Sequence, residues 1–194
     1  IFYTAPTAIR SLMGAGDDVF VWNPGDDDDT LEGQAGTDTM LFNGANVGEN
    51  IDISANGGRV RFFRDVANVT MDLNDVEVID FNALGGADNI VVGDLSGTDA
   101  REVRIDLAAA GGAGDGQADM VTVQGTNGDD VAVLSLRDGD LVVSGLAAEF
   151  GVSQATVSGA VAALVRKGLL GRQPDPEDGR AVRLTGSVRD ITQQ

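Results

Sequence analysis

The stretch from Met13 to Phe42 reads MGAGDDVFVWNPGDDDDTLEGQAGTDTMLF and carries one pattern three times. In each copy, glycine and small residues lead to an aspartate, one spacer follows, and a large apolar residue comes next. The copies occupy residues 14–20, 25–31 and 33–40. Because the apolar residue lies in a short strand after the turn, we expect it to point inward, so that stacked copies share one core.

The turn that begins each copy offers oxygen ligands. Glycine readily adopts the positive φ of tight turns, and such turns expose backbone carbonyl groups. Carbonyl and carboxylate oxygens are the ligands that Ca²⁺ prefers. The sequence therefore predicts a Ca²⁺ site whose ligands in the first array are Gly16, Asp18, Asp27, Asp29, Gly36 and Asp38. The alternative is that these aspartates only cap turns through side-chain hydrogen bonds.

The three copies resemble the RTX, or haemolysin-type, nonapeptide repeat. This resemblance implies a mainly β fold, a right-handed parallel β-roll or β-solenoid loaded with Ca²⁺. In that family each nonapeptide is half a coil, so Asp18 and Asp38 are expected on one edge and Asp29 on the opposite edge. Crowded carboxylates repel one another without a cation, so the metal-free fold should be weak at these turns.

Further strands and turns follow the array as far as residue 145. Alternating apolar residues predict strands near residues 51–53, 60–62, 69–73, 76–81, 103–107 and 120–123, and again near 131–136 and 141–143. Two turns repeat the aspartate pattern, which adds Asp88 and Asp130 to the predicted metal ligands, and Asp119 is a further candidate. Strands at intervals of about ten residues, each ending in Gly or Asp, are typical of a solenoid.

Charge is distributed unevenly along the 194 residues. The net charge is −18, and residues 149–194 contain six basic and five acidic residues, a net charge of +1. Residues 1–148 therefore carry the other seven basic and 26 acidic residues, a net charge of −19. A surface this acidic repels nucleic acid and is relieved by bound cations, although acids also simply keep a surface soluble.

Composition excludes several kinds of chemistry. The chain has no Cys and no His, which removes disulfides, thiolate or imidazole metal sites and histidine-based nucleophilic catalysis. Nothing singles out an acid–base pair among the many carboxylates, so we expect a binding module, not an enzyme. No apolar run reaches membrane-spanning length. The chain starts at Ile1 without a signal-peptide pattern, as expected of a fragment or an engineered chain.

The character of the sequence changes near residue 146. Residues 146–152 predict a short helix that ends at Gly151, Ser153 is a good N-cap, and residues 155–170 predict an amphipathic helix. A turn-rich loop at 172–180 and a strand at 181–185 follow. We therefore divide the chain into a β-solenoid at 1–145, a small α+β segment at 146–186 and a tail at 187–194.

This segment resembles the core of a MarR-type winged helix-turn-helix. The matching residues are LAAEFGVSQATVSGAVAALVRKGLL at 146–170 and PDPEDGRAVRLT at 174–185. By that resemblance, the recognition helix in the major groove opens with Ser153, Gln154, Ala155, Thr156 and Ser158. Arg180 would be the wing residue that reaches the minor groove. The family's dimerisation helices are absent from the matching stretch, so affinity for DNA should be poor.

Two functions from different classes follow. The first is a Ca²⁺-binding repeat module of a secreted bacterial protein, in which Ca²⁺ drives coil stacking. The alternative is a cytoplasmic DNA-binding regulator fragment fused to an acidic β domain. Two further interpretations of the C-terminal segment remain open: it caps the solenoid end, or the chain is a chimera of two unrelated genes joined near Gly145.

Overall fold

The computed structural model describes residues 1–3, 7–125, 133–137, 140–144, 149–152, 171–174 and 182–185, with side chains for residue 1 and residues 7–125. The described residues form two β-sheets and one short 3₁₀ helix at Val66–Asn68. Sheet A contains, in spatial order, β1 (Phe2–Tyr3), β3 (Val19–Trp22), β5 (Thr39–Asn43), β9 (Val78–Asn82), β11 (Glu102–Asp106), β15 (Glu149–Val152), β14 (Asp140–Ser144), β13 (Val133–Arg137), β17 (Val182–Thr185) and β16 (Gly171–Pro174). Sheet B contains β12 (Met120–Val123), β10 (Asn89–Val92), β6 (Asn50–Asn56), β7 (Arg59–Arg64), β8 (Val69–Asn74), β4 (Thr30–Glu32) and β2 (Arg10–Leu12).

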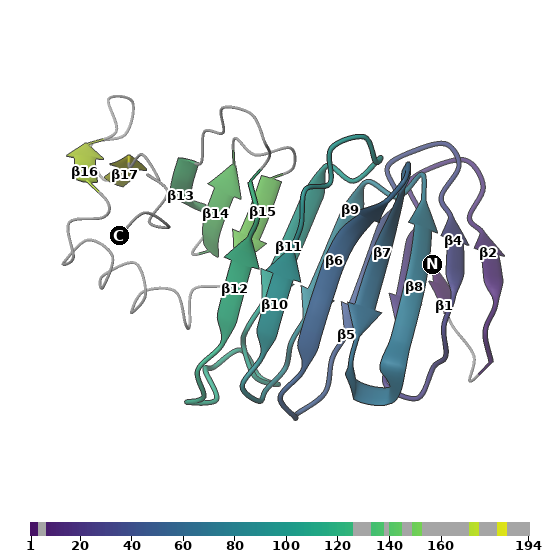
Figure 1. Cartoon of the computed structure of the whole chain (residues 1–194), viewed down its shortest axis with the longest axis horizontal. Helices are drawn as coiled ribbons and strands as arrows, with labels where there is room; N and C mark the ends of the chain where they lie inside the picture. The colour runs from purple at the N-terminus through teal and green to yellow at the C-terminus, as the bar shows by residue number, and fades with distance from the viewer. Residues whose placement is uncertain are drawn as a thin grey trace, which may run out of the picture.

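From β2 to β12 the chain passes back and forth between the two sheets, and most neighbouring strands run parallel (Figure 1). The first array sets the spacing: Arg10 aligns with Thr30 in sheet B, and Val19 aligns with Thr39 in sheet A. Equal offsets in both sheets mean that the repeat returns the chain to the same place one layer along. The right-handed β-roll class remains a prediction.

An inserted hairpin departs from the expected parallel pattern. Strand β7 pairs antiparallel with both β6 and β8 in the middle of sheet B. Gly57 and Gly58 form the two-residue connection between β6 and β7, and Gly57 has a φ of +66°. Tight hairpin turns of this kind need positive φ, which glycine adopts without steric cost. This turn therefore reverses the strand direction locally.

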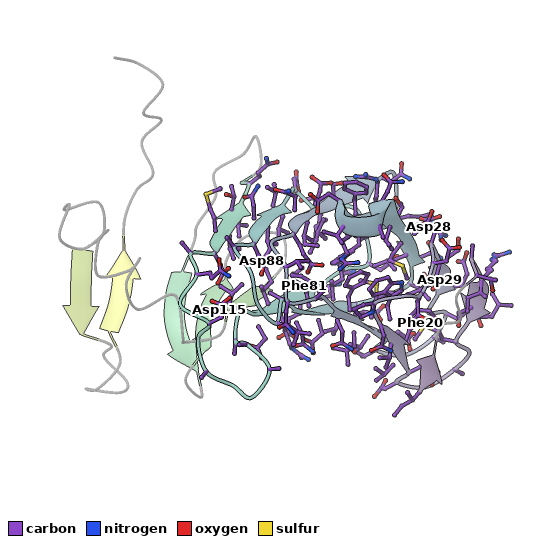
Figure 2. The ribbon with its side chains drawn as sticks, turned by 90° about the horizontal axis from the view of Figure 1, so that it is seen from below. Phe20, Asp28, Asp29, Phe81, Asp88 and Asp115 are labelled. Atoms are coloured by element: carbon purple, nitrogen blue, oxygen red, sulfur yellow. The ribbon has the colours of Figure 1, made fainter. Side chains whose placement is uncertain are left out.

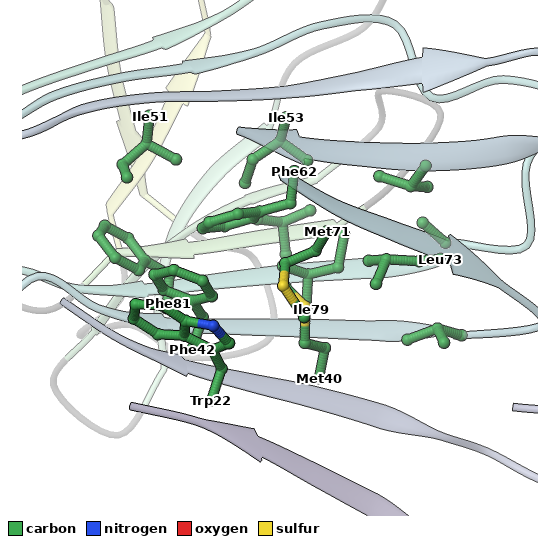
Figure 3. Close-up of a cluster of buried hydrophobic side chains, with 14 of the residues drawn as sticks. Trp22, Met40, Phe42, Ile51, Ile53, Phe62, Met71, Leu73, Ile79 and Phe81 are labelled. Carbon is green, nitrogen blue, oxygen red and sulfur yellow. The ribbon is translucent and has the colours of Figure 1, made fainter. Parts of the chain in front are cut away.

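The core lies between the two sheets. Alternate residues of the strands are buried, as the period of two in a β-strand requires. Register aligns Trp22, Phe42 and Phe81 in one row across sheet A. The rings of Trp22 and Phe42 stack with centroids 4.0 Å apart, and Phe62 of sheet B lies 4.4 Å from Phe42 (Figure 3). These aromatic contacts join neighbouring coils and also join the two sheets.

The C-terminal strands correct one prediction. Glu149–Val152 is strand β15, parallel to β11 and antiparallel to β14, so a helix over 146–152 is wrong for these four residues. In register, Phe150 aligns with Val103 and Val152 with Ile105, so apolar residues alternate in step on the two strands. Such a segment gains ladder hydrogen bonds from β11, and this tertiary pairing overrides the local helix pattern.

The wing region also differs in detail. Gly171–Pro174 is strand β16 and pairs antiparallel with β17, although residues 172–174 were expected in a loop. The predicted strand at 181–185 is present as β17. The predicted helix at 155–170 lies outside the described residues.

Candidate functional site

Acidic side chains link successive coils where the chain enters sheet A. Asp38 Oδ1 accepts a hydrogen bond of 2.9 Å from the Asp18 amide, and Glu77 Oε2 accepts one of 2.7 Å from the Asp38 amide. These three residues immediately precede, or lie next to, β3, β5 and β9, which are neighbours in the sheet. We call Asp18, Asp38 and Glu77 the sheet A ladder. The carboxylates of Asp38 and Glu77 each accept a hydrogen bond from a backbone amide of the adjacent coil.

A second set follows the same rule where the chain enters sheet B. Asp88 Oδ1 accepts a hydrogen bond of 2.8 Å from the Glu49 amide, and Asp119 Oδ1 accepts one of 3.0 Å from the Asp88 amide. Glu49, Asp88 and Asp119 form the sheet B ladder, one residue before β6, β10 and β12. Nearby, Asp115 Oδ2 accepts a hydrogen bond of 2.7 Å from the Gly86 amide. The carboxylates again join coils that neighbour in space.

Asp29 lies at the start of β4, on the same side of sheet B as that ladder but toward the other end of the stack (Figure 2). Its Oδ1 accepts a hydrogen bond of 2.9 Å from the Ile9 amide. Its neighbour Asp28 is exposed and accepts a hydrogen bond of 2.7 Å from the Thr70 amide. The tetrad of aspartates at 26–29 therefore contacts both flanking coils.

Two of these aspartates bury an oxygen that has no partner. Asp29 is 2 % exposed and Asp38 is fully buried, and the Oδ2 atom of each has no hydrogen-bond partner among the described residues. An unpaired buried carboxylate oxygen costs free energy, because it has lost its hydration shell without replacement. The backbone also packs closely around Asp38. A Cβ added at Gly33 would overlap the Asp75 carbonyl oxygen and lie 2.7 Å from Asp38 Oδ2.

Burial shifts the proton affinity of these carboxyl groups. Burial raises the pKa of Asp29 to about 6, and the charges of Asp26, Asp27 and Asp28 act in the same direction. Burial likewise raises the pKa of Asp88 to about 6, with help from the charge of Asp119. These shifts mean that the ionised forms of both groups are disfavoured in the folded chain.

The pKa of Asp38 is also raised. Burial raises its pKa first, and the charges of Glu77, Asp18 and Asp17 raise it further. The hydrogen bond from the Asp18 amide acts in the opposite direction but does not cancel these effects.

Glu49 differs from the other ladder acids because it has a buried cation. Its side chain is fully buried and forms an ion pair with Arg64, whose side chain is 3 % exposed. Arg64 also lies over the Trp22 ring, 5.4 Å from its centroid. Burial raises the pKa of Glu49, whereas the Arg64 guanidinium opposes that shift. The sheet B ladder thus contains its own counter-charge.

The structure brings some predicted ligands together and separates others. Asp18 and Asp38 share one edge, as expected, and Asp29 lies with the strands of sheet B. Gly16 and Gly36 have positive φ and lie at the turns of adjacent coils. Asp27 is exposed, and its Oδ1 accepts a hydrogen bond from the Asp28 amide, so it does not join Asp29 in the interior.

The remaining predicted residues lie outside the described part. These are Asp130 among the metal ligands and Ser153, Gln154, Ala155, Thr156, Ser158 and Arg180 among the DNA-binding candidates.

Sequence reasoning missed Glu49 and Glu77. Both occupy the aspartate position of the repeat: each is followed two residues later by a buried apolar residue, Ile51 or Ile79. A search that allowed Glu at that position would have found them. Their turns also lack the expected glycine spacing, because Gly48 directly precedes Glu49 and the short connection at 75–77 contains no glycine.

The geometry fits a cation only in part. Among the side chains described, no three acidic groups converge as a metal cluster. What the turns do offer is the unpaired Oδ2 atoms of Asp29 and Asp38 and nearby backbone carbonyl oxygens, which are hard donors of the kind that Ca²⁺ takes.

Comparison with known proteins gives one match. A family model described as the MarR family matches residues 131–181, which include strands β13, β14, β15 and β16. No curated protein and no solved structure matches the chain. The MarR-type resemblance of the C-terminal segment is therefore supported by a family match, whereas the RTX resemblance has no such support. Within the described residues, no helix is long and apolar enough to cross a membrane.

Proposed function

We propose that residues 131–181 act as a MarR-like DNA-binding element, fused to an acidic β region. The observation that carries the proposal is the family match over these residues. In this proposal Ser153, Gln154, Ala155, Thr156 and Ser158 begin a recognition helix that reads base edges, and Arg180 contacts the minor groove from the wing. A protein with this role acts in the cytoplasm.

Charge makes this binding weak and sensitive to salt. Residues 1–148 carry a net charge of −19, which repels phosphates, and residues 149–194 carry +1. We therefore expect a low-affinity complex whose association constant falls steeply as salt increases.

Fluorescence anisotropy with a labelled duplex tests the DNA-binding proposal in the full chain. Arg180→Ala should weaken the complex by about 1–3 kcal/mol, since it removes a groove contact. Arg61→Ala is the matched control, because Arg61 lies on the outer face of sheet B and pairs with Asp52. Equal loss with both variants, or no binding by the wild type at low salt, would contradict the proposal.

A second candidate function is Ca²⁺ binding by the β region, which we infer from a separate observation. The unpaired buried oxygens of Asp29 and Asp38 support it, because a cation would replace the hydration that these oxygens lose. Asp29 and Asp38 would each hold an ion at a separate turn, and the Asp75 carbonyl oxygen lies near the second of these turns. Ca²⁺ would then neutralise the acidic turns and stabilise coil stacking in a right-handed β-roll, as in a secreted repeat module.

Thermal unfolding followed by circular dichroism tests the Ca²⁺ proposal. Millimolar Ca²⁺ should raise the unfolding midpoint relative to excess chelator, whereas the same concentration of Mg²⁺ should have a smaller effect, because Mg²⁺ demands a stricter geometry. An equal unfolding midpoint in Ca²⁺ and in chelator would contradict the proposal and mean that these aspartates act only as turn caps.

A further inference from the structure

Two Asn-Gly pairs lie in the described part of the chain, and the structure treats them differently. They are Asn43–Gly44 at the end of β5 and Asn56–Gly57 at the tip of the β6–β7 hairpin. An asparagine followed by glycine is the sequence most prone to cyclise, because glycine leaves its own amide nitrogen sterically open. Asparagine is one of the thermolabile residues for this reason. The local sequence alone does not distinguish the two pairs.

The Asn56–Gly57 pair is exposed to solvent, and little in its surroundings opposes cyclisation. Both residues are exposed, and a Cβ added to Gly57 would meet no atom within 4 Å. No hydrogen bond holds the Asn56 side chain among the described residues, and Gly57 lies beyond the last paired positions, Asn56 and Arg59. Only the end of one hairpin must open for the Gly57 nitrogen to reach the Asn56 side chain. Hairpin tips open at low free-energy cost.

At the Asn43–Gly44 pair, both the asparagine side chain and the attacking backbone amide form hydrogen bonds. Its Nδ2 donates to Asn23 Oδ1 at 2.9 Å, and its Oδ1 accepts from Asn82 Nδ2 at 2.8 Å. The attacking atom is engaged as well, because the Gly44 amide donates to the Asn82 carbonyl oxygen at 2.8 Å. Cyclisation at Asn43 therefore requires three contacts between neighbouring coils to break first.

We propose that Asn56 is a site of spontaneous deamidation in the folded protein and that Asn43 is protected from it. The Gly57 amide nitrogen attacks Asn56 Cγ, a bond forms between them, and the Cγ–Nδ2 bond breaks. Ammonia leaves with the amide proton, and a five-membered succinimide remains. Water then adds to either ring carbonyl and produces aspartate or isoaspartate at position 56. No other co-reactant is needed.

The product changes the charge at one end of an ion-pair network. Asn56 aligns with Arg59 across the hairpin. Arg59 contacts Asp72 at 2.7 Å and Glu32 of strand β4 at 3.2 Å, so it links the hairpin to the first array. A new carboxylate opposite Arg59 competes with these two acids for one guanidinium. Isoaspartate also lengthens the backbone at the turn and disturbs the end of the β6–β7 pairing.

Peptide mapping by mass spectrometry tests the assignment in the full chain, kept at mildly alkaline pH and sampled over days. In the native protein, Asn56 should deamidate at least about tenfold faster than Asn43, because the hairpin tip opens more readily than the stack of coils. In concentrated guanidinium chloride the two sites should react at similar rates, since they share the same dipeptide. Asn56→Gln should abolish the reaction at position 56, and Asn43→Gln should leave the Asn56 rate unchanged.

Each result decides the question. A fast native rate at Asn56 with a slow rate at Asn43, equalised by denaturant, supports the proposal. An Asn56 that stays intact in the native protein but reacts in denaturant would overturn it, because the folded hairpin would then protect this site. Equal native rates at both sites would also overturn it, since the contacts of Asn43 would then offer no protection. The result does not depend on DNA or Ca²⁺ binding.

Discussion

The two acidic ladders share a hydrogen-bonding rule but differ in how buried charge is balanced. In the sheet B ladder, Glu49 pairs with the buried guanidinium of Arg64. In the sheet A ladder, Asp38 is as deeply buried and has no cation, and one of its oxygens has no partner among the described residues. The repeat turns are therefore not equivalent. Where the chain supplies its own cation, an external cation is not needed; at Asp38, where it does not, our second proposal places Ca²⁺.

The largest expected effect comes from removing the built-in cation. Arg64→Met leaves Glu49 buried and unpaired, and we expect the free energy of unfolding to fall by about 3–5 kcal/mol. Arg61→Met is the matched control, because its ion pair with Asp52 is partly exposed and its loss should cost at most about 1 kcal/mol. Chemical unfolding measures both. Similar losses in the two variants would remove the distinction between buried and exposed pairs.

The second-largest effect distinguishes two roles for Asp38, as a metal ligand or as a turn cap. Asp38→Asn keeps an oxygen that can accept from the Asp18 amide but removes the charge. If Ca²⁺ acts here, saturating Ca²⁺ should stabilise the wild type by about 2–3 kcal/mol and the variant by much less. In chelator the variant should be at least as stable as the wild type, because it buries no charge.

Glu49→Gln is the control for the Asp38 test, since Arg64 already neutralises Glu49 and its change should leave the Ca²⁺ response intact. A Ca²⁺ response that survives in Asp38→Asn and disappears in Glu49→Gln would reverse our assignment of the two ladders.

A smaller effect concerns pH and involves Asp29 and Asp88. The pKa of each is about 6 in the folded chain, against 3.8 for an ordinary aspartate. Between about pH 4 and pH 6 the folded state therefore binds more protons than the unfolded state, so these groups make the free energy of unfolding fall as pH rises. Unfolding in chelator at pH values on both sides of this window measures the effect.

The pH test needs a difference between variants, because other carboxyl groups act in the opposite direction. Hydrogen bonds from Arg59 lower the pKa of Glu32, and hydrogen bonds from Asn50 lower that of Asp65. Asp29→Asn and Asp88→Asn should each become more stable relative to the wild type at pH 7 than at pH 4. A constant difference across this range would show that burial does not perturb these two groups.

The smallest effect is expected on the outer face of sheet B. Asp52→Asn removes the partner of Arg61, but the side chains of Asp52 and Arg61 are 45 % and 38 % exposed. Solvent screens this pair, so the free energy of unfolding should change by at most about 1 kcal/mol in chemical unfolding. If Asp52→Asn lowered the free energy of unfolding as much as Arg64→Met does, an exposed ion pair would matter as much as the buried pair in the sheet B ladder.

Several features were predictable because they depend on local pattern. Spacing of twenty residues between Asp18 and Asp38 brought both to one edge, as the repeat predicted. The repeat also predicted that the apolar residue two positions after each aspartate points inward, and Phe20, Leu31 and Met40 are all buried. The reversal at β7 was not predicted, because period-two alternation is the same for parallel and antiparallel strands. Glu149–Val152 was predicted as a helix, because local helical spacing says nothing about the open edge of β11.

By itself, the sequence determined most strands of the β region, the acidic turns and the resemblance of the C-terminal segment to the MarR type, because each depends on residues close together in the chain. Only the tertiary structure decided which carboxylates are buried, which one meets Arg64 and which Asn-Gly pair is exposed. These properties depend on how the hairpin and the coils pack, through contacts between residues fifteen to forty positions apart, and such contacts leave no mark in any single stretch of sequence.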